Sequence, residues 1–154
     1  MTPALRRWAM MRAAALPMSP TFIPFTPWTT LASYRAFLQR LMELDLAAQI
    51  APIQLAIRLL IPEGSLLLEL PEIRRMVAPY DTSGLCYPWK NVDGAVDALC
   101  AEIQATIRRE EQRHASRTDI FRKIWELAGT GPFPPDTPMA SRATIPYLTE
   151  PWYC

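Results

Sequence analysis

Two polar side chains interrupt an otherwise apolar stretch in the first half of the sequence. In residues 53–61, IQLAIRLLI, Gln54 and Arg58 alternate with isoleucine and leucine residues that fall on the opposite face of a β-strand. A guanidinium group presents a planar set of donors that matches a carboxylate through two parallel hydrogen bonds. The spacing therefore predicts a polar face that binds a carboxylate ligand, with a solvent-facing strand surface or a structural salt bridge of Arg58 as the alternatives.

Residues that could perform nucleophilic or metal chemistry are scarce. The sequence contains three cysteines and one histidine, with no CxxC, CxxxCxxC, GxGxxG or Walker A pattern. His114 lies in a charged segment and is predicted to be solvated, and Cys86 and Cys100 each fit a packing role best. The sequence therefore predicts neither a catalytic residue nor a metal site within this chain.

The elements that must position Gln54 and Arg58 form two strand–turn–helix units. The first joins a short strand at Thr21–Phe25, through the turn TPWTT, to a helix over residues 31–44 that Thr30 caps. The second places a strand at Ile53–Ile61 before the turn PEGS. This order is typical of an α/β enzyme.

The second half of the sequence is predicted to be helical and then extended. Asp93 caps a helix at residues 94–113, Thr118 caps a helix that ends at Leu127, and residues 129–154 carry six of the sixteen prolines. The resulting domain prediction is residues 1–78 as strand–helix units, 79–128 as a helical extension, and 129–154 as an extended, aromatic tail.

Composition narrows the possible partners and the compartment. The chain has 154 residues and a formal net charge of +1, which gives no global field for nucleic acid or an anionic membrane. Its apolar runs are too short to span a bilayer. Three cysteines make no disulfide framework, so the default prediction is a reducing, cytoplasmic compartment.

Both strand segments resemble the C-terminal third of certain radical S-adenosylmethionine (radical SAM) proteins. The resemblance rests on PTFIPFTPWTTL at residues 20–31 and on PIQLAIRLLIP at residues 52–62, followed by a Gly-Ser pair and by LLE at residues 67–69. The last residues, EPWYC, are similar to the start of the Cys-Sec-Ala-Glu-Pro or Cys-Cys-Ala-Glu-Pro tail of one subgroup, with Cys154 at its first position.

The resemblance implies an α/β fold, an incomplete TIM-type barrel of about two parallel strands with several helices. In the family, a [4Fe–4S] cluster binds S-adenosylmethionine and cleaves it reductively to a radical that abstracts hydrogen from a small-molecule or peptide substrate. Gln54, Arg58 and Thr26 would then face substrate or cofactor near the carboxyl ends of the strands. Cys154 would belong to a redox-active tail.

The sequence departs from the family where the cluster should be bound. Neither the three-cysteine motif nor the first barrel strands have a counterpart here. We therefore interpret the chain as the C-terminal portion of a longer enzyme, with no cofactor and no activity of its own. On this interpretation the chain ends at Cys154 because a selenocysteine codon is read there as a stop. Uncovered sheet edges would make such a piece associate or aggregate.

A different class of protein remains open. The helices predicted at residues 31–44, 94–113 and 118–127 would form the bundle of a complete, small, α-rich interaction module, and the tail rich in proline and aromatic residues would bind a partner in an extended form. This alternative predicts that Ile53–Ile61 is buried within a closed fold instead of lying at a sheet edge.

Overall fold

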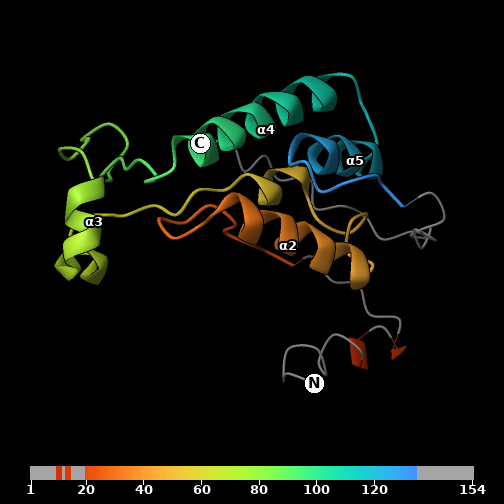
Figure 1. Cartoon of the computed structure of the whole chain (residues 1–154), viewed down its shortest axis with the longest axis horizontal. Coiled ribbons are helices and arrows are strands. Elements are labelled where there is room, and N and C mark those ends of the chain that lie inside the picture. The colour runs from red at the N-terminus through yellow and green to blue at the C-terminus, as the bar shows by residue number, and fades with distance from the viewer. Residues whose placement is uncertain (1–9, 12, 15–19, 135–154) are drawn as a thin grey trace.

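The structure is a computed structural model that describes residues 10–11, 13–14 and 20–134 (Figure 1). Within residues 20–134 the α-helices are α2 (Leu31–Glu43), α3 (Pro71–Met76), α4 (Gly94–Gln112) and α5 (Arg117–Leu127). Two short 3-10 helices, η1 (Pro52–Leu55) and η2 (Leu66–Glu69), lie between α2 and α3. None of the helices in the described ranges is both long enough and apolar enough to cross a membrane.

The predicted α/β fold with an incomplete TIM-type barrel is wrong, because residues 20–134 contain helices but no strand or sheet. The two segments predicted as parallel strands pair as strands at a single parallel bridge between Phe25 and Arg58. Two backbone hydrogen bonds form it, from the Phe25 N–H to the Ile57 carbonyl at 3.2 Å and from the Leu59 N–H to the Phe25 carbonyl at 2.8 Å.

Proline and the lack of neighbouring strands explain this failure. Pro52 occupies the first turn of η1, so residues 52–55 coil into a 3-10 helix where an extended strand was expected. Pro24 has no N–H to donate beside the bridge. Parallel strands are stable as layers covered on both faces, and two short segments, one interrupted and one preceded by proline, do not make such a layer.

The helices follow their sequence signals more closely. α2 begins after Thr30 as predicted, in a capping box that pairs Thr30 with Ser33, and ends one residue before the predicted Leu44. The Asp93 cap of α4 is confirmed by its bond to the Ala95 N–H. The predicted Thr118 cap is wrong, because Ser116, two residues earlier, accepts from the Asp119 N–H at 3.1 Å and caps α5.

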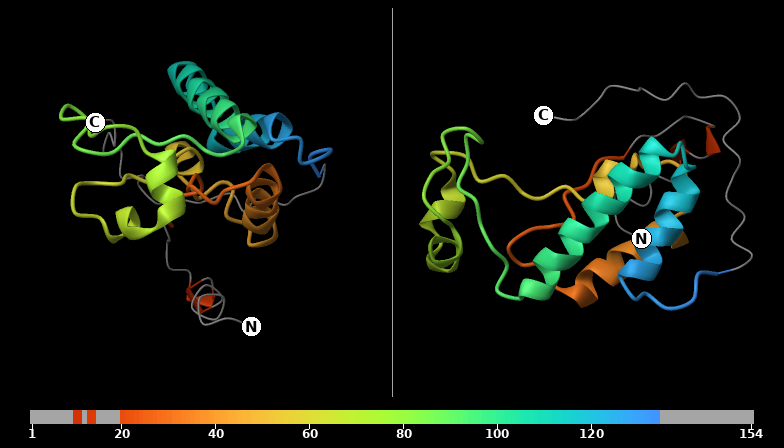
Figure 2. Two further views of the ribbon diagram at one scale, coloured as in Figure 1. Left: turned by 60° about the vertical axis from the view of Figure 1, so that its left-hand side comes forward. Right: turned by 90° about the horizontal axis from the view of Figure 1, so that it is seen from above.

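Three amphipathic helices bury the main core. α4 and α5 pack against each other, and both contact η1, which lies between them and α2 (Figure 2). Each helix contributes residues at the three- and four-residue spacing of a helix face. The fully buried side chains at the centre are Tyr34 and Leu38 of α2, Ile103 and Ile107 of α4, and Ile120, Phe121 and Ile124 of α5. We call this assembly the helical body.

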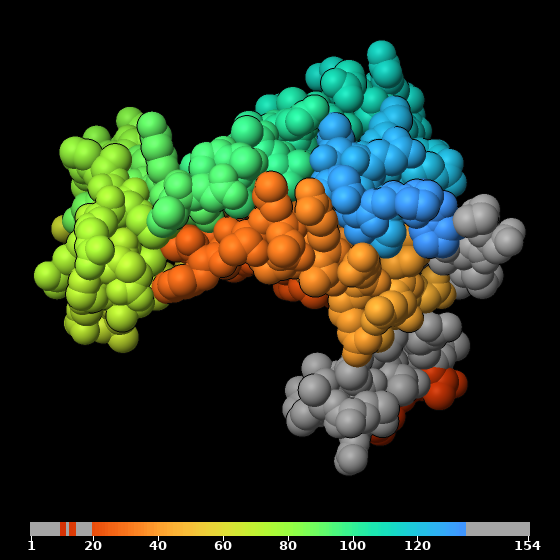
Figure 3. Space-filling model, viewed as in Figure 1, coloured from red at the N-terminus to blue at the C-terminus, as the bar shows by residue number. Residues whose placement is uncertain are grey.

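A second, smaller core lies beside the helical body. Ile61, Ile73 and Trp89 are buried together, and partly buried side chains from η2, α3 and the following loop pack on them. These residues belong to the range 59–89, which we call the small lobe. Figure 3 shows it, in yellow-green, projecting from one end of the helical body with a notch between the two.

The predicted tail at 129–154 lies mostly outside the described residues, as does Cys154. Its first residues are anchored to the helical body. The Trp125 Nε1–H donates to the Gly131 carbonyl at 2.9 Å, and the Phe133 ring packs edge-on against Trp125.

Candidate functional site

Thr26 stands in a tight turn that closes on itself. The Thr29 hydroxyl accepts from the Thr26 N–H at 2.9 Å and donates to the Pro24 carbonyl at 2.9 Å. The Thr29 N–H in turn donates to the Thr26 carbonyl at 3.0 Å. Thr29 therefore pairs the Thr26 N–H and the Pro24 carbonyl, the backbone groups on either side of the Phe25 bridge.

Gln54 is almost fully buried, and its amide oxygen is used internally. It accepts a hydrogen bond from the Phe22 N–H at 2.9 Å, across the same pair of segments that the Phe25–Arg58 bridge joins. The side chain therefore holds the segment at residues 20–25 against η1. Gln54 lies among packed residues of the helical body, four residues before Arg58 in the sequence.

Arg58 lies where the helical body and the small lobe meet. One guanidinium nitrogen contacts the Asp97 carboxylate at 2.7 Å, and another donates to the Trp89 carbonyl at 2.9 Å. Its guanidinium carbon lies 4.0 Å from the centre of the Trp89 ring, a cation–π geometry. The Arg58 and Asp97 side chains are 27% and 26% exposed, so water reaches the ion pair from one side.

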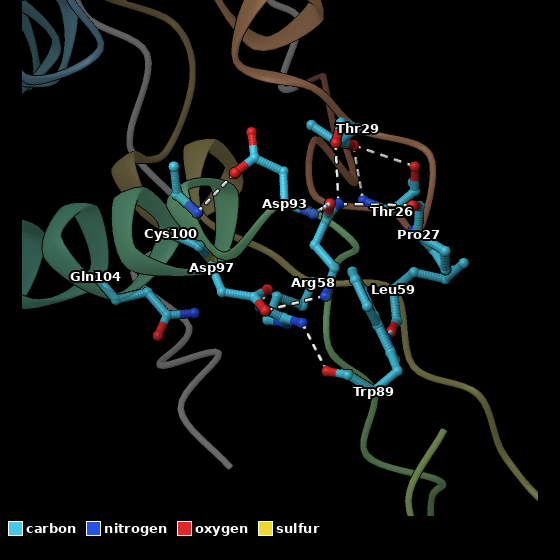
Figure 4. Close-up of polar contacts among 12 residues, drawn as sticks. Thr26, Pro27, Thr29, Arg58, Leu59, Trp89, Asp93, Asp97, Cys100 and Gln104 are labelled. Carbon is cyan, nitrogen blue, oxygen red and sulfur yellow. Dashed lines mark hydrogen bonds and ion pairs between the residues drawn. The ribbon is translucent and has the colours of Figure 1, made fainter. Parts of the chain in front are cut away.

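Asp97 connects Arg58 to the turn that contains Thr26. Its second carboxylate oxygen accepts from the Asn91 N–H at 2.9 Å, and the Asn91 side-chain amide donates to the Thr29 carbonyl at 2.9 Å. Figure 4 shows Thr29, Arg58 and Asp97 converging from the turn, the Arg58 segment and the start of α4. The structure thus brings Arg58 and Thr26 into one polar network.

Cys100 lies on α4 close to this network but is not poised as a nucleophile. Its side chain is buried, and the thiol lies 3.8 Å from the Ala56 carbonyl, which also accepts from Gln104 at 3.1 Å. Burial raises the pKa of the Cys100 thiol, and the nearby Arg58 guanidinium only partly offsets that effect. The thiol is therefore protonated near neutral pH.

A second charged cluster lies between α4 and α5. The Glu110 side chain is buried and pairs with Lys123 at 2.5 Å, Arg109 at 3.2 Å and Arg113 at 3.6 Å. The hydrogen bond from Lys123 is the main reason that the pKa of Glu110 lies below its usual value, with burial acting in the opposite direction. With three cationic partners, the Glu110 carboxylate serves to hold α4 and α5 together and does not act as a general base.

The chemistry that this network offers is recognition of charge and shape. Arg58 can hold a carboxylate, as it already holds Asp97, and the Trp89 ring stacks on its planar guanidinium. Sequence reasoning found Arg58 but missed Asp97, Asn91 and Trp89. These partners lie 31 or more residues further along the chain, and only the first-turn carboxylate of a capped helix hints at Asp97.

The described residues include no group of three or more histidine, cysteine and acidic side chains that could hold a metal ion. The described cysteines, Cys86 and Cys100, are free thiols on a loop and on α4, and they do not provide the ligand set of an iron–sulfur cluster. The sequence matches no protein-family model, and neither a curated protein nor a solved structure is significantly similar to it.

Proposed function

We propose that this chain is the C-terminal portion of a radical SAM enzyme and that it shapes the substrate side of the active site. The observation that carries the proposal is the contact between the two segments that resemble the family. Residues 20–31 and 52–62 are far apart in sequence, yet they lie side by side and parallel where Phe25 meets Arg58. Their polar residues Thr26 and Arg58 join one network.

The part proposed for this chain is positioning. Arg58 would orient a carboxylate-bearing substrate, and the TPWTT turn would form the rim beside it. The [4Fe–4S] cluster and S-adenosylmethionine would be bound by other residues of a longer polypeptide, because the described cysteines do not fit a cluster. A reducing, cytoplasmic compartment fits this proposal, since Cys86 and Cys100 are free thiols.

The coding sequence provides the first test. We expect an in-frame CxxxCxxC motif upstream of these residues, and a UGA codon directly after the Cys154 codon followed by codons for Ala-Glu-Pro. An upstream reading frame without the three cysteines would overturn the enzyme proposal. A different stop codon would overturn only the assignment to the selenocysteine-tailed subgroup.

Reconstitution of the complete open reading frame provides the second test. The purified protein is incubated with iron and sulfide without oxygen, and the release of 5′-deoxyadenosine from S-adenosylmethionine is measured under reducing conditions. We expect release from the complete protein and none from residues 1–154 alone. A complete protein that binds iron and sulfide but never cleaves S-adenosylmethionine would contradict the proposal.

The alternative of a small interaction module is favoured by a specific observation. Large apolar side chains are exposed on the turn, the loops and the small lobe, among them Leu66 at 77% and Val92 at 89%. Exposed apolar side chains mark a protein-binding surface where they gather in one patch. Burial of Ile53–Ile61 does not decide between the enzyme portion and the interaction module, because Leu55 and Ile61 are buried whereas Leu60 is exposed. The module should bind a partner without any cofactor, which the reconstitution experiment distinguishes.

A further inference from the structure

The chain crosses twice between the helical body and the small lobe. It leaves along residues 56–60 and returns along residues 89–93, and α3 stands apart from α2, α4 and α5 in Figures 1 and 2. The lobe has its own core and therefore does not depend on the helical body for burial of its apolar side chains. The contacts of the two crossing segments therefore determine how firmly the small lobe is attached to the helical body.

Arg58 ties the outgoing segment to the returning one. Its guanidinium donates to the Trp89 carbonyl at 2.9 Å and covers the Trp89 ring. The Trp89 indole N–H donates back to the Leu59 carbonyl at 2.7 Å. These contacts join the crossing segments to each other but not to the helices.

Asp97 supplies the charged attachment to the helical body, beside the Phe25 backbone bridge and the Asn91–Thr29 hydrogen bond. From the first turn of α4, one carboxylate oxygen binds Arg58 at 2.7 Å and the other accepts from the Asn91 N–H at 2.9 Å. A single side chain therefore holds the outgoing and the returning segments at once. We propose that Asp97 is a latch that adds to the Phe25 bridge in fixing the small lobe to the helical body, and that loss of its charge loosens the lobe as a unit.

Contacts inside the lobe explain why it would move as a unit. The Ala78 N–H donates to the Pro88 carbonyl at 2.7 Å and the Tyr87 N–H to the Ile61 carbonyl at 2.8 Å, and just outside the lobe the Lys90 N–H donates back to the Met76 carbonyl at 3.1 Å. None of these bonds involves Asp97. Release of the latch should therefore loosen the crossing segments and leave the interior of the lobe intact. The inference does not depend on the radical SAM proposal.

Hydrogen–deuterium exchange with mass spectrometry on the full chain tests the latch. The variant Asp97→Asn keeps the size of the side chain but loses its charge and one acceptor oxygen. Since the Arg58–Asp97 hydrogen bond joins two charged groups but is partly exposed to water, we expect exchange at residues 57–59 and 89–91 to rise about tenfold. Exchange within Ile103–Ile107 of α4 should not change.

Asp93→Asn is the matched control. Asp93 precedes the same helix, and its carboxylate binds the Ala95 N–H instead of Arg58. This variant removes one negative charge from the same helix end, and asparagine still caps a helix. We expect exchange at the crossing segments to stay at the wild-type rate. Equal acceleration in both variants would overturn the latch, because the effect would then belong to the helix end.

Two further measurements keep the proposal testable if Asp97→Asn fails to fold. Arg58→Lys keeps the positive charge but cannot bridge Asp97 and the Trp89 carbonyl with one planar group, so it should loosen the same crossing segments. In the wild-type chain, added salt should accelerate exchange there before it affects α4, because the ion pair is partly exposed. No change at the crossing segments in either measurement would overturn the proposal.

Discussion

Replacement of Tyr34 by phenylalanine tests the energetics of the main core through a single oxygen atom. The Tyr34 side chain is buried on α2, and its hydroxyl donates to the Leu55 carbonyl of η1 at 2.8 Å. The Tyr34 ring stacks on Phe25 with the ring centres 4.7 Å apart. Phenylalanine keeps this stacking and removes only the hydrogen bond, so the change isolates the tie between α2 and η1.

The expected loss of stability follows from the Leu55 carbonyl that remains buried after the substitution. The Leu55 carbonyl would be left without its donor in a place that water does not reach, which costs about 1–3 kcal/mol of unfolding free energy. For a chain of this size that corresponds to a fall of about 3–10 °C in the unfolding midpoint. Thermal unfolding followed by circular dichroism measures the shift.

The pH dependence of stability gives a second readout of the same hydroxyl. Burial is the main reason that the pKa of Tyr34 is raised above its ordinary value. The neutral phenol is thus favoured in the folded chain, whereas an unfolded tyrosine ionises near pH 10. This contribution to stability is complete below about pH 10 and falls above it, by at most about 1.4 kcal/mol per pH unit. Tyr34→Phe should lose this component.

Tyr80→Phe is the control for the same chemical change. Tyr80 is half-buried and packs on Tyr87, and its hydroxyl makes no hydrogen bond within the part of the chain that the structure describes. We expect its stability to stay within about 0.5 kcal/mol of the wild-type value. If Tyr34→Phe were no less stable than Tyr80→Phe, the argument for a buried tie between α2 and η1 would be refuted.

Two other substitutions test the helices. Glu110→Gln should destabilise the α4–α5 contact at neutral pH. The wild-type chain loses the stability contributed by the Glu110 carboxylate as pH falls through its lowered pKa, and the variant should lack this loss. Thermal midpoints measured at several pH values test both expectations. Thr30→Ala breaks the capping box of α2 and should cost about 1 kcal/mol in chemical denaturation, with Thr82→Ala, on an exposed loop, as the neutral comparison.

Local signals were sufficient to predict the helices. The Thr30 and Asp93 caps, and the apolar residues spaced three and four apart after them, define α2 and α4 to within one residue of their observed ends. Each of these signals acts over a single turn and needs no other part of the chain. The cap of α5 was misassigned because Ser116 and Thr118 lie two residues apart and both have capping side chains.

The strands could not be predicted in the same way, because a strand depends on its neighbours. Residues 53–61 alternate as a strand would, yet Pro52 starts a 3-10 helix and only the bridge at Arg58 remains extended and paired. Alternation describes which side chains share a face, and it does not supply the hydrogen-bonding partners that a strand requires. In this chain the helices α2, α4 and α5 bury the apolar residues of η1 directly.

The polar face illustrates the same limit for the site. Alternation drew attention to Arg58 as a polar side chain in an apolar stretch, and a salt bridge was one of the interpretations that the sequence left open. The structure supplies that partner as Asp97, at 2.7 Å and 39 residues further along the chain. An external carboxylate that took the place of Asp97 on Arg58 would break the ion pair between the outgoing segment and α4, and would leave the Asn91 N–H on the other Asp97 oxygen. Binding of a ligand at Arg58 and motion of the small lobe would therefore be linked, each favouring the other through the loss of one ion pair.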